Sequence, residues 1–289
     1  MTELIHEPDL YIDGRWTPGG GTDLEVENPA TEEVTGRITQ ASTDDVETAV
    51  AAARAAFGPW AATPAAERAA VLRRLGEVLT ERADLFADII NREQGSPPRV
   101  ARALHVDTPI AVVEATVEAL ERFEFRSELG NSLILREPVG VVAAITPWNL
   151  PLHQVVVKVV PALAAGATVV LKPAGLTPLA AFELARAFEA AGLPAGAFNL
   201  VPGSGRVVGE LLTRHPGVDH VSFTGSTPVG ARSRPPPRSR SSGSPSSSAA
   251  SPPAWCSPAP RTSCSPRLSR SRSRTASSTA ARPAPRCPG

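Results

Sequence analysis

Apolar runs alternate with helical segments between residues 139 and 223, and this alternation constrains the fold more than any other feature of the sequence. The apolar runs, each bounded by turn residues, are Val139–Thr146, Thr168–Lys172, Ala197–Val201 and His220–Phe223. Runs of this length are typical of strands that are buried on both faces. The segments with helical spacing between them are Pro151–Ala165, Thr177–Ala191 and Gly205–Arg214. The pattern predicts an α/β fold, a Rossmann-like parallel sheet with right-handed crossovers and helices on both faces.

The first 125 residues predict further helices and a short strand. Tyr11–Trp16 is expected to form a strand with a turn. A capping box at residues 42–45 begins the first predicted helix. Thr63 as the cap, followed by Pro64 at the first helical position, begins a second helix, and Pro109–Phe123 is expected to be a third.

The composition changes abruptly after Ala231. Residues 232–289 contain 11 of the 29 basic residues and none of the 29 acidic ones, so residues 1–231 have a net charge of −11. Ser, Arg, Pro and Ala make up 48 of the last 58 residues. Such a segment cannot bury enough apolar area to offset the roughly 1–2 kcal/mol per residue that backbone ordering costs. We therefore expect one structured region over residues 1–231 and a disordered low-complexity tail over residues 232–289.

Charge and cysteine content exclude several classes of protein. The acidic balance of residues 1–231 argues against a nucleic-acid-binding surface there. All three cysteines (Cys256, Cys264 and Cys287) lie in the tail, which excludes a disulfide framework in the structured region. No apolar run reaches 18 residues, and the first residues lack the basic-then-apolar pattern of a signal peptide. We expect a cytoplasmic protein with no membrane association.

Polar motifs follow the first two predicted strands, at the edge where open α/β sheets bind their ligands. The first motif is Thr146-Pro147-Trp148-Asn149. Its asparagine, held between two prolines, can present a fixed amide donor to an oxyanion, or it can simply cap the next helix. The second motif contains Lys172, which can bind a ribose hydroxyl or a phosphate as a point charge. Alternatively, this lysine is a solvated residue at the start of a helix.

The other two motifs are rich in glycine. Val201–Gly209 contains the pattern G-x-G-x-x-x-G, which is one residue longer than the Rossmann fingerprint and is also compatible with an ordinary turn. In Phe223–Gly230, Gly225 and Ser226 are placed to begin a helix. Backbone N–H groups and a hydroxyl at such a position can bind a pyrophosphate.

Taken together, these motifs resemble the aldehyde dehydrogenase superfamily over about residues 10–231, including the stretches Asn28–Glu33 and Arg136–Pro151. The resemblance implies NAD(P)-dependent oxidation of a small aldehyde to a carboxylic acid, with NAD or NADP as the cofactor and no metal. It also implies that Asn149 is the catalytic oxyanion-hole asparagine. The residues that it places against the cofactor are Thr146, Pro147, Trp148, Lys172, Gly205, Phe223, Gly225, Ser226 and Val229.

The sequence departs from the family pattern at several positions, including Leu150, where Phe or Tyr is usual, and Pro228, where Glu is common. Gly175 stands where the family commonly has an acid that binds the adenine ribose, which weakens the expectation of a strict NAD preference over NADP. The nucleophilic cysteine and the Glu-Leu-Gly-Gly motif that activates water are both missing from their expected places. We therefore expect the chain as written to be inactive, and the homo-oligomer of the family to be doubtful for it.

The genetic code offers an explanation for the missing motifs. Residues 244–252 can be encoded so that a shifted frame reads Thr-Leu-Glu-Leu-Gly-Gly-Lys-Ser, and residues 276–284 so that it reads Val-Phe-Asn-Ser-Gly-Gln-Ala-Cys. We interpret the tail as the product of a reading frame that slips just after Ala231. Two alternatives remain open: a non-catalytic nucleotide-binding remnant, or a protein whose basic tail binds nucleic acid.

Overall fold

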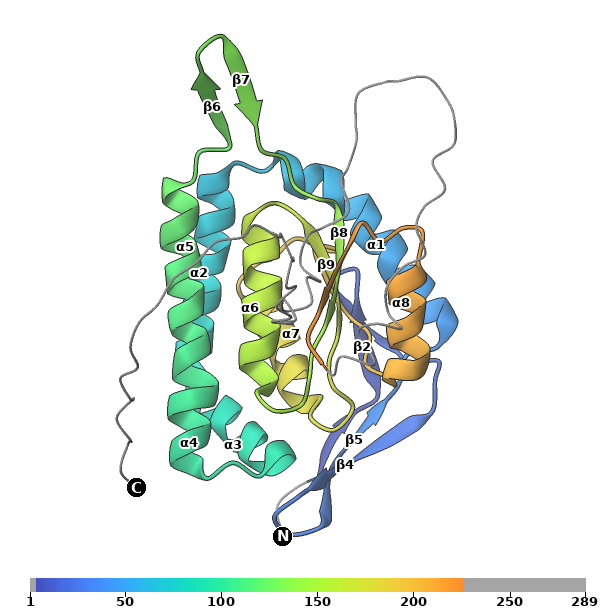
Figure 1. Ribbon diagram of the computed structural model, residues 1–289. Coiled ribbons are helices and arrows are strands. Elements are labelled where there is room, and N and C mark those ends of the chain that lie inside the picture. Colours follow the sequence, from blue (N-terminus) through green and yellow to red (C-terminus); the bar gives the residue numbers. More distant parts are fainter. Residues whose placement is uncertain (1–3, 226–289) are drawn as a thin grey trace, which may run out of the picture. The chain divides into compact units, whose positions relative to one another are not determined.

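The computed structural model describes residues 4–225, so the low-complexity tail, Ser226 and Val229 lie outside the described residues. A six-stranded sheet with the order β11-β8-β9-β10-β2-β3 forms the centre of the fold (Figure 1). Its four parallel strands are β8 (Val141–Ile145), β9 (Thr168–Lys172), β10 (Phe198–Leu200) and β11 (His220–Phe223). The parallel sheet predicted from the alternating pattern is confirmed.

Helices cover both faces of this sheet, as predicted. One face packs against α6 (Pro151–Ala164) and α7 (Leu179–Ala190). The other packs against α1 (Thr43–Ala62), the π-helical turn η2 (Gly205–Gly209) and α8 (Glu210–Arg214) (Figure 1). Successive residues of β8 alternate between the two cores, with Val142 facing α6 and Val141 facing α1. Burial of alternate side chains on opposite faces explains why the strand sequence is apolar throughout.

The predicted capping box at the start of α1 is present. The Ser42 side chain accepts a hydrogen bond from the backbone N–H of Asp45 at 3.2 Å, and the Asp45 carboxylate accepts one from the N–H of Ser42 at 2.7 Å. The prediction that Thr63 caps the second helix is wrong. Thr63 instead ends α1 and donates its hydroxyl to the carbonyl of Pro59 at 3.0 Å, while Pro64 is the N-cap of α2 (Ala65–Glu81).

The remaining helices form a layer outside α6. In this layer α2 packs against α5 (Thr108–Arg122), close to the predicted Pro109–Phe123, and both contact α6 (Figure 1). The segments between them are α3 (Ala83–Gln94), α4 (Pro98–Arg102) and the π-helical turn η1 (Ala103–Asp107). This layer buries the apolar face of α6 that the sheet leaves uncovered.

The predicted strand and turn at residues 11–16 form a hairpin of β2 (Asp9–Ile12) and β3 (Arg15–Pro18). Asp13 and Gly14 both have positive φ angles, 52° and 72°, as a two-residue type I′ turn requires. β2 then pairs antiparallel with β10 and extends the central sheet.

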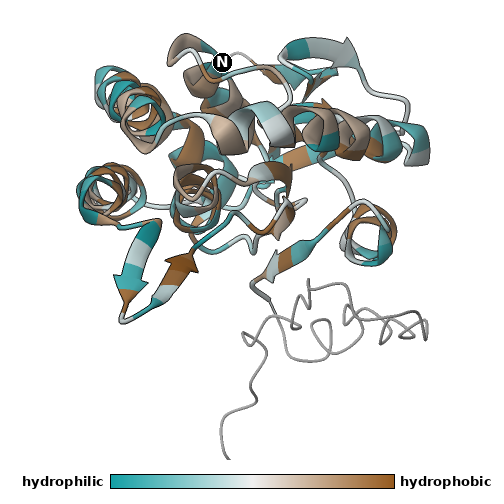
Figure 2. Cartoon of the chain, turned by 90° about the horizontal axis from the view of Figure 1, so that it is seen from above, coloured by the Kyte–Doolittle hydropathy of each residue, from teal (hydrophilic) through white to brown (hydrophobic). Residues whose placement is uncertain are grey.

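Two further sheets lie outside the central one. β5 (Glu33–Thr39) pairs with β1 (Ile5–Glu7) and with β4 (Asp23–Asn28). β6 (Arg126–Leu129) and β7 (Ser132–Leu135) form a projecting hairpin, whose second strand is largely apolar (Figure 2).

Candidate functional site at the carboxyl edge of the sheet

The carboxyl ends of the four parallel strands meet at one edge of the sheet, and the described residues of the four sequence motifs follow these ends. Backbone hydrogen bonds continue across the strands beyond their ends. The N–H of Thr146 donates to the carbonyl of Lys172 at 3.2 Å, and the N–H of Thr224 donates to that of Ile145 at 3.1 Å. Because β9 and β11 flank β8 on opposite sides, the winding of the chain reverses beside β8. Ligands of open α/β sheets bind at such a reversal.

Lys172 is buried at the end of β9, with 3% of its surface exposed. Its Nζ donates to the carbonyl of Pro173 at 2.6 Å and to that of Gly203 at 2.9 Å. An ammonium group has three N–H donors, so these two bonds leave one for a ligand. Burial lowers the pKa of Lys172 to about 8. The alternative of a solvated lysine is therefore wrong. Lys172 is buried, and its ammonium group forms hydrogen bonds with the loop that follows β9 and with the loop that follows β10.

The loop after β8 is anchored at both ends and presents Asn149 to solvent. Thr146 is buried, and the Thr177 hydroxyl donates to the carbonyl of Trp148 at 3.2 Å. Asn149 is exposed, and its side chain forms no hydrogen bond within the described part of the chain. The N-cap of α6 is Leu150, without a side-chain capping bond. Asn149 therefore does not act as a cap in this structure, and its amide is available to a ligand.

The glycine-rich loop after β10 packs closely against the turn η2 that follows it. A Cβ atom on Gly203 would come within 2.5 Å of Val208 Cγ2, so a side chain there would displace the loop. Ser204 caps the following turn, because its Oγ accepts the N–H of Val207 at 3.1 Å. Gly205 is exposed at the beginning of η2. The loop thus offers bare backbone at the point where the sequence predicts contact with a cofactor.

The fourth motif is only partly described. Phe223 ends β11 and is partly exposed, and Gly225 is exposed immediately after it. Ser226 and Val229 lie outside the described residues, so their predicted contacts with a pyrophosphate stay predictions.

Exposed apolar side chains surround these polar groups. Trp148 after β8, Leu176 after β9 and Val207 after β10 are 54%, 67% and 53% exposed. Exposed apolar side chains at the carboxyl edge of such a sheet can contact a ligand that binds there. The edge can therefore hold a ligand that has both flat apolar parts and groups that accept hydrogen bonds.

Sequence reasoning missed Lys158. This lysine lies in the middle of α6, where burial lowers its pKa, and its Nζ donates to the Ser222 hydroxyl of β11 at 3.2 Å. The pKa of His220, on the same strand, is lowered by burial and then by the charge of Lys158. A single lysine inside the apolar run Val155–Val160 was the signal that could have identified it.

His105 is buried in η1 and packs near His153, which lies in the first turn of α6. His105 Nε2 lies 3.2 Å from the Ser96 hydroxyl, and the Nδ1 atoms of both histidines are buried without a hydrogen-bond partner among residues 4–225. Burial, and secondly the charge of His153, lowers the pKa of His105. A proton on His105 would therefore introduce an unsatisfied charge into the buried space beside His153.

We expect the folded state to lose stability as the pH falls below about 6.5, the ordinary pKa of histidine in an unfolded chain. The pKa of His105 is lower in the folded state, so the unfolded state binds more protons in acid. The expected result is a melting temperature that falls between pH 7.5 and pH 5.5, and falls less in His105→Gln. An equal fall in the variant and the parent protein would contradict this assignment.

The described residues contain no helix that is both long enough and apolar enough to cross a membrane. Over the same residues, His, Cys, Asp and Glu side chains do not gather into a group of three that could hold a metal ion.

The fold and the position of these motifs define the class of open, doubly wound α/β domains that bind a ligand at the carboxyl ends of their parallel strands. Residues 16–233 match the aldehyde dehydrogenase family, and the chain belongs to that family. The match ends two residues after the change in composition at Ala231, and the chain spans about half the length of the curated relatives that it matches.

The relatives include enzymes and solved structures with bound cofactors. The chain is 44% identical to 3-succinoylsemialdehyde-pyridine dehydrogenase of a Pseudomonas species over 77% of this chain and 47% of the relative. It is similar to a variant of aldehyde dehydrogenase C from Pseudomonas syringae in complex with NAD+ and octanal, at 45% identity and a TM-score of 0.77, over 78% of this chain and 47% of that one. An NADP-dependent enzyme of E. coli is 36% identical with a TM-score of 0.74, over 78% and 48% of the two chains.

Proposed function

We propose that this chain is the cofactor-binding half of an aldehyde dehydrogenase that oxidises an aldehyde to a carboxylic acid with NAD or NADP. The observation that carries the proposal is the arrangement of Asn149, Lys172 and Gly205 on three neighbouring strand ends of one sheet edge. The similarity to enzymes whose structures contain NAD+ or depend on NADP supports the same cofactor site. The same proposal includes a frame slip after Ala231, which removes the nucleophile and the water-activating glutamate from the chain as written.

The residues at this edge fit a nicotinamide dinucleotide. One N–H of Lys172 remains for a ribose hydroxyl, and the exposed faces of Trp148 and Val207 offer apolar walls to flat rings. When bound, the nicotinamide ring supplies the acceptor for hydride. The protein groups orient the dinucleotide along the edge, and Asn149 donates its amide N–H to the aldehyde oxygen as that oxygen gains negative charge.

We expect Lys172→Ala, in a protein whose reading frame is restored after residue 231, to raise the KM of the cofactor more than it lowers kcat. The change removes a hydrogen bond to the ribose that contributes about 1–3 kcal/mol. Because the pKa of Lys172 is about 8, kcat/KM for the cofactor should also fall as the pH rises through that value in the parent protein. The fall should be absent from the alanine variant, and steady-state kinetics between pH 6.5 and 9.5 test both points. An unchanged cofactor KM in the variant would contradict the assigned contact.

We expect Gly175→Glu to shift the cofactor preference toward NAD. Gly175 follows Pro173 and Ala174 in the loop beside Lys172, and the nearest atom to a Cβ placed there is 3.6 Å away, so a Cβ can be added without a clash. A carboxylate there repels the 2′-phosphate of NADP, and we expect the ratio of kcat/KM for NADP to that for NAD to fall by about 10- to 100-fold. Gly175→Gln is the uncharged control and should leave the ratio within a few-fold of the parent value. An equal loss in both variants would show that size rather than charge is responsible.

A further inference from the structure

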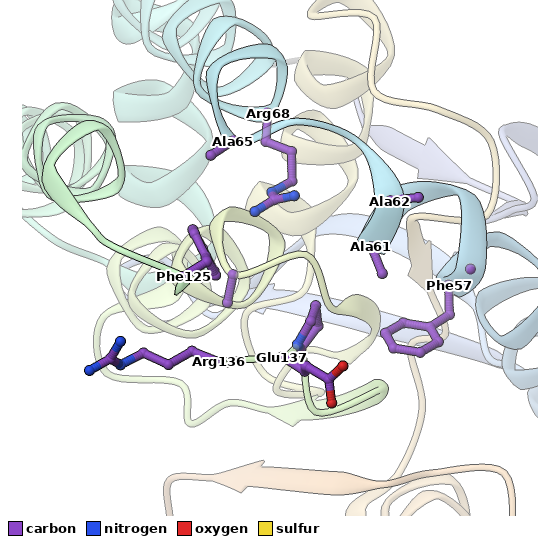
Figure 3. Close-up of a pocket in the computed structure, with 11 residues that line it drawn as sticks. Phe57, Ala61, Ala62, Ala65, Arg68, Phe125, Arg136 and Glu137 are labelled. Carbon is purple, nitrogen blue, oxygen red and sulfur yellow. The ribbon is translucent and has the colours of Figure 1, made fainter. Parts of the chain in front are cut away.

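A hollow lies at the opposite edge of the sheet from the candidate cofactor site. Its volume is about 660 Å³, and it is bordered by the end of α1, the beginning of α2 and the segment before β8 (Figure 3). Pro138, which precedes β8, and Ala165, which follows α6, place it at the amino ends of the parallel strands. The volume is typical of sites for small molecules, which hold roughly 300–1,000 Å³.

Arg68 is the main polar group of this hollow. The residue is 4% exposed and extends from α2 toward the space between Phe125 and Ala61 (Figure 3). Its Nε donates to the carbonyl of Ala164 at 3.0 Å, and its Nη1 donates to the carbonyl of Thr63. These two carbonyls lie at the C-terminal ends of α6 and α1. The negative ends of the two helix dipoles therefore offset part of the positive charge of Arg68.

The charge of Arg68 is not paired with an acid. Among residues 4–225 no carboxylate forms an ion pair with it, and its Nη2 has no hydrogen-bond partner there. Burial lowers its pKa. The N-terminal end of α2 borders the same hollow at Ala65 and has no side-chain cap. Both features favour an anion in this space.

The walls determine what kind of anion fits. Phe57, Ala61, Phe125 and Pro138 form apolar walls, and the Arg68 guanidinium lies 5.2 Å from the centre of the Phe125 ring. A monoanion with an apolar body would therefore fit better than a phosphate, which needs more donors than one guanidinium edge.

The other charged groups of the hollow do not change this assignment. Arg136 extends away from the centre, and its guanidinium donates to the carbonyl of Glu124 at 2.9 Å and to the Ser127 hydroxyl at 3.0 Å (Figure 3). Glu137 is exposed at the rim, where it opposes an anion. Removal of that carboxylate should therefore tighten binding.

We infer that this hollow is a binding site for a small carboxylate with an apolar body, in which Arg68 Nη2 donates to the carboxylate and the apolar chain lies between Phe57 and Phe125. The site lies at the opposite edge of the sheet from Asn149 and Lys172. It is therefore independent of the proposed function.

Isothermal titration of the 289-residue chain with octanoate tests the inference, with octanamide as the uncharged ligand of equal length. We expect octanoate to bind at least about 10-fold more tightly than octanamide, because only the carboxylate pairs with the guanidinium. Glu137→Gln should tighten octanoate binding by about 2- to 5-fold, because it removes a like charge near the ligand. Equal binding of the two ligands, or no heat from octanoate at millimolar concentration, would overturn the inference.

Gly58 offers a position at the border of the hollow where a side chain can be added without a clash. It borders the hollow within α1, and a Cβ added there meets no atom within 4 Å. We expect Gly58→Leu to weaken octanoate binding at least about 10-fold by occupying the space, and the matched Gly58→Ala to change it by less than about 2-fold. Both variants should fold, because each replaces a glycine inside a helix. Unchanged binding in Gly58→Leu would show that octanoate binds elsewhere and would overturn the inference.

Discussion

The 289-residue chain is expected to oxidise no aldehyde, whereas the same protein with its reading frame restored after codon 231 is expected to do so. Residues 1–231 contain no cysteine, so the structured region offers no thiolate to attack an aldehyde. Binding of a cofactor cannot replace a missing nucleophile and a missing base. The measurement is the rate of NADH or NADPH formation by the two purified proteins with a panel of aldehydes.

The three tail cysteines provide the control for this prediction. Cys256, Cys264 and Cys287 lie among Ser, Pro and Arg residues. Only the diffuse charge of the arginines could lower a thiol pKa there. Turnover by the 289-residue chain that disappears when one of these cysteines is changed to serine would contradict the proposed frame slip.

Asn149→Ala is expected to lower kcat of the frame-restored protein by about 10²–10³ and to leave cofactor affinity nearly unchanged. The donor acts on charge that develops during the reaction, so its loss raises the barrier without weakening ground-state binding. Within residues 4–225 the Asn149 side chain forms no hydrogen bond, and the N-cap of α6 is Leu150. We therefore expect its loss to have little effect on the fold.

Asn149→Asp separates the oxyanion role from a capping role. Aspartate is as good an N-cap as asparagine, so a capping residue would tolerate the change with full activity and stability. A carboxylate facing a developing oxyanion repels it, so the proposed role requires the aspartate variant to be at least as impaired as the alanine variant. Comparison of kcat and melting temperature for both variants decides between the two roles.

The central sheet could be predicted from the sequence because its strands are buried on both faces. Thr168–Lys172 was predicted with the bounds that β9 has, since every residue of that strand is buried. The order of the strands could not be read from the apolar pattern, which does not specify neighbours. The placement of α1 against the same face as α8 depends on contacts between residues 46–53 and residues 208–212, far apart in the sequence.

The outer sheets were missed for a different reason. β4 and β5 carry many polar residues, and β6 and β7 are four residues long and mostly exposed. Their sequences lack the apolar runs that marked the central strands. The hollow around Arg68 was also beyond sequence reasoning, because its walls come from four separate segments of the chain.

The sequence indicated where the residues of the candidate site lie, but not which hydrogen bonds they form. The described residues of the motifs lie at one edge of the sheet, because parallel strands place their carboxyl ends together. The two carbonyls that hold Lys172 and the contact between Lys158 and Ser222 depend on loop geometry and on packing between elements. Such contacts leave no periodic signal in a sequence.

A crystal structure of the frame-restored protein with NAD+ would test the central claim most directly. We expect the dinucleotide to lie along the carboxyl edge, with Lys172 Nζ within about 2.7–3.2 Å of an adenine-ribose hydroxyl and the nicotinamide end directed toward Asn149. A dinucleotide bound away from this edge, with Lys172 still bonded only to the carbonyls of Pro173 and Gly203, would contradict it.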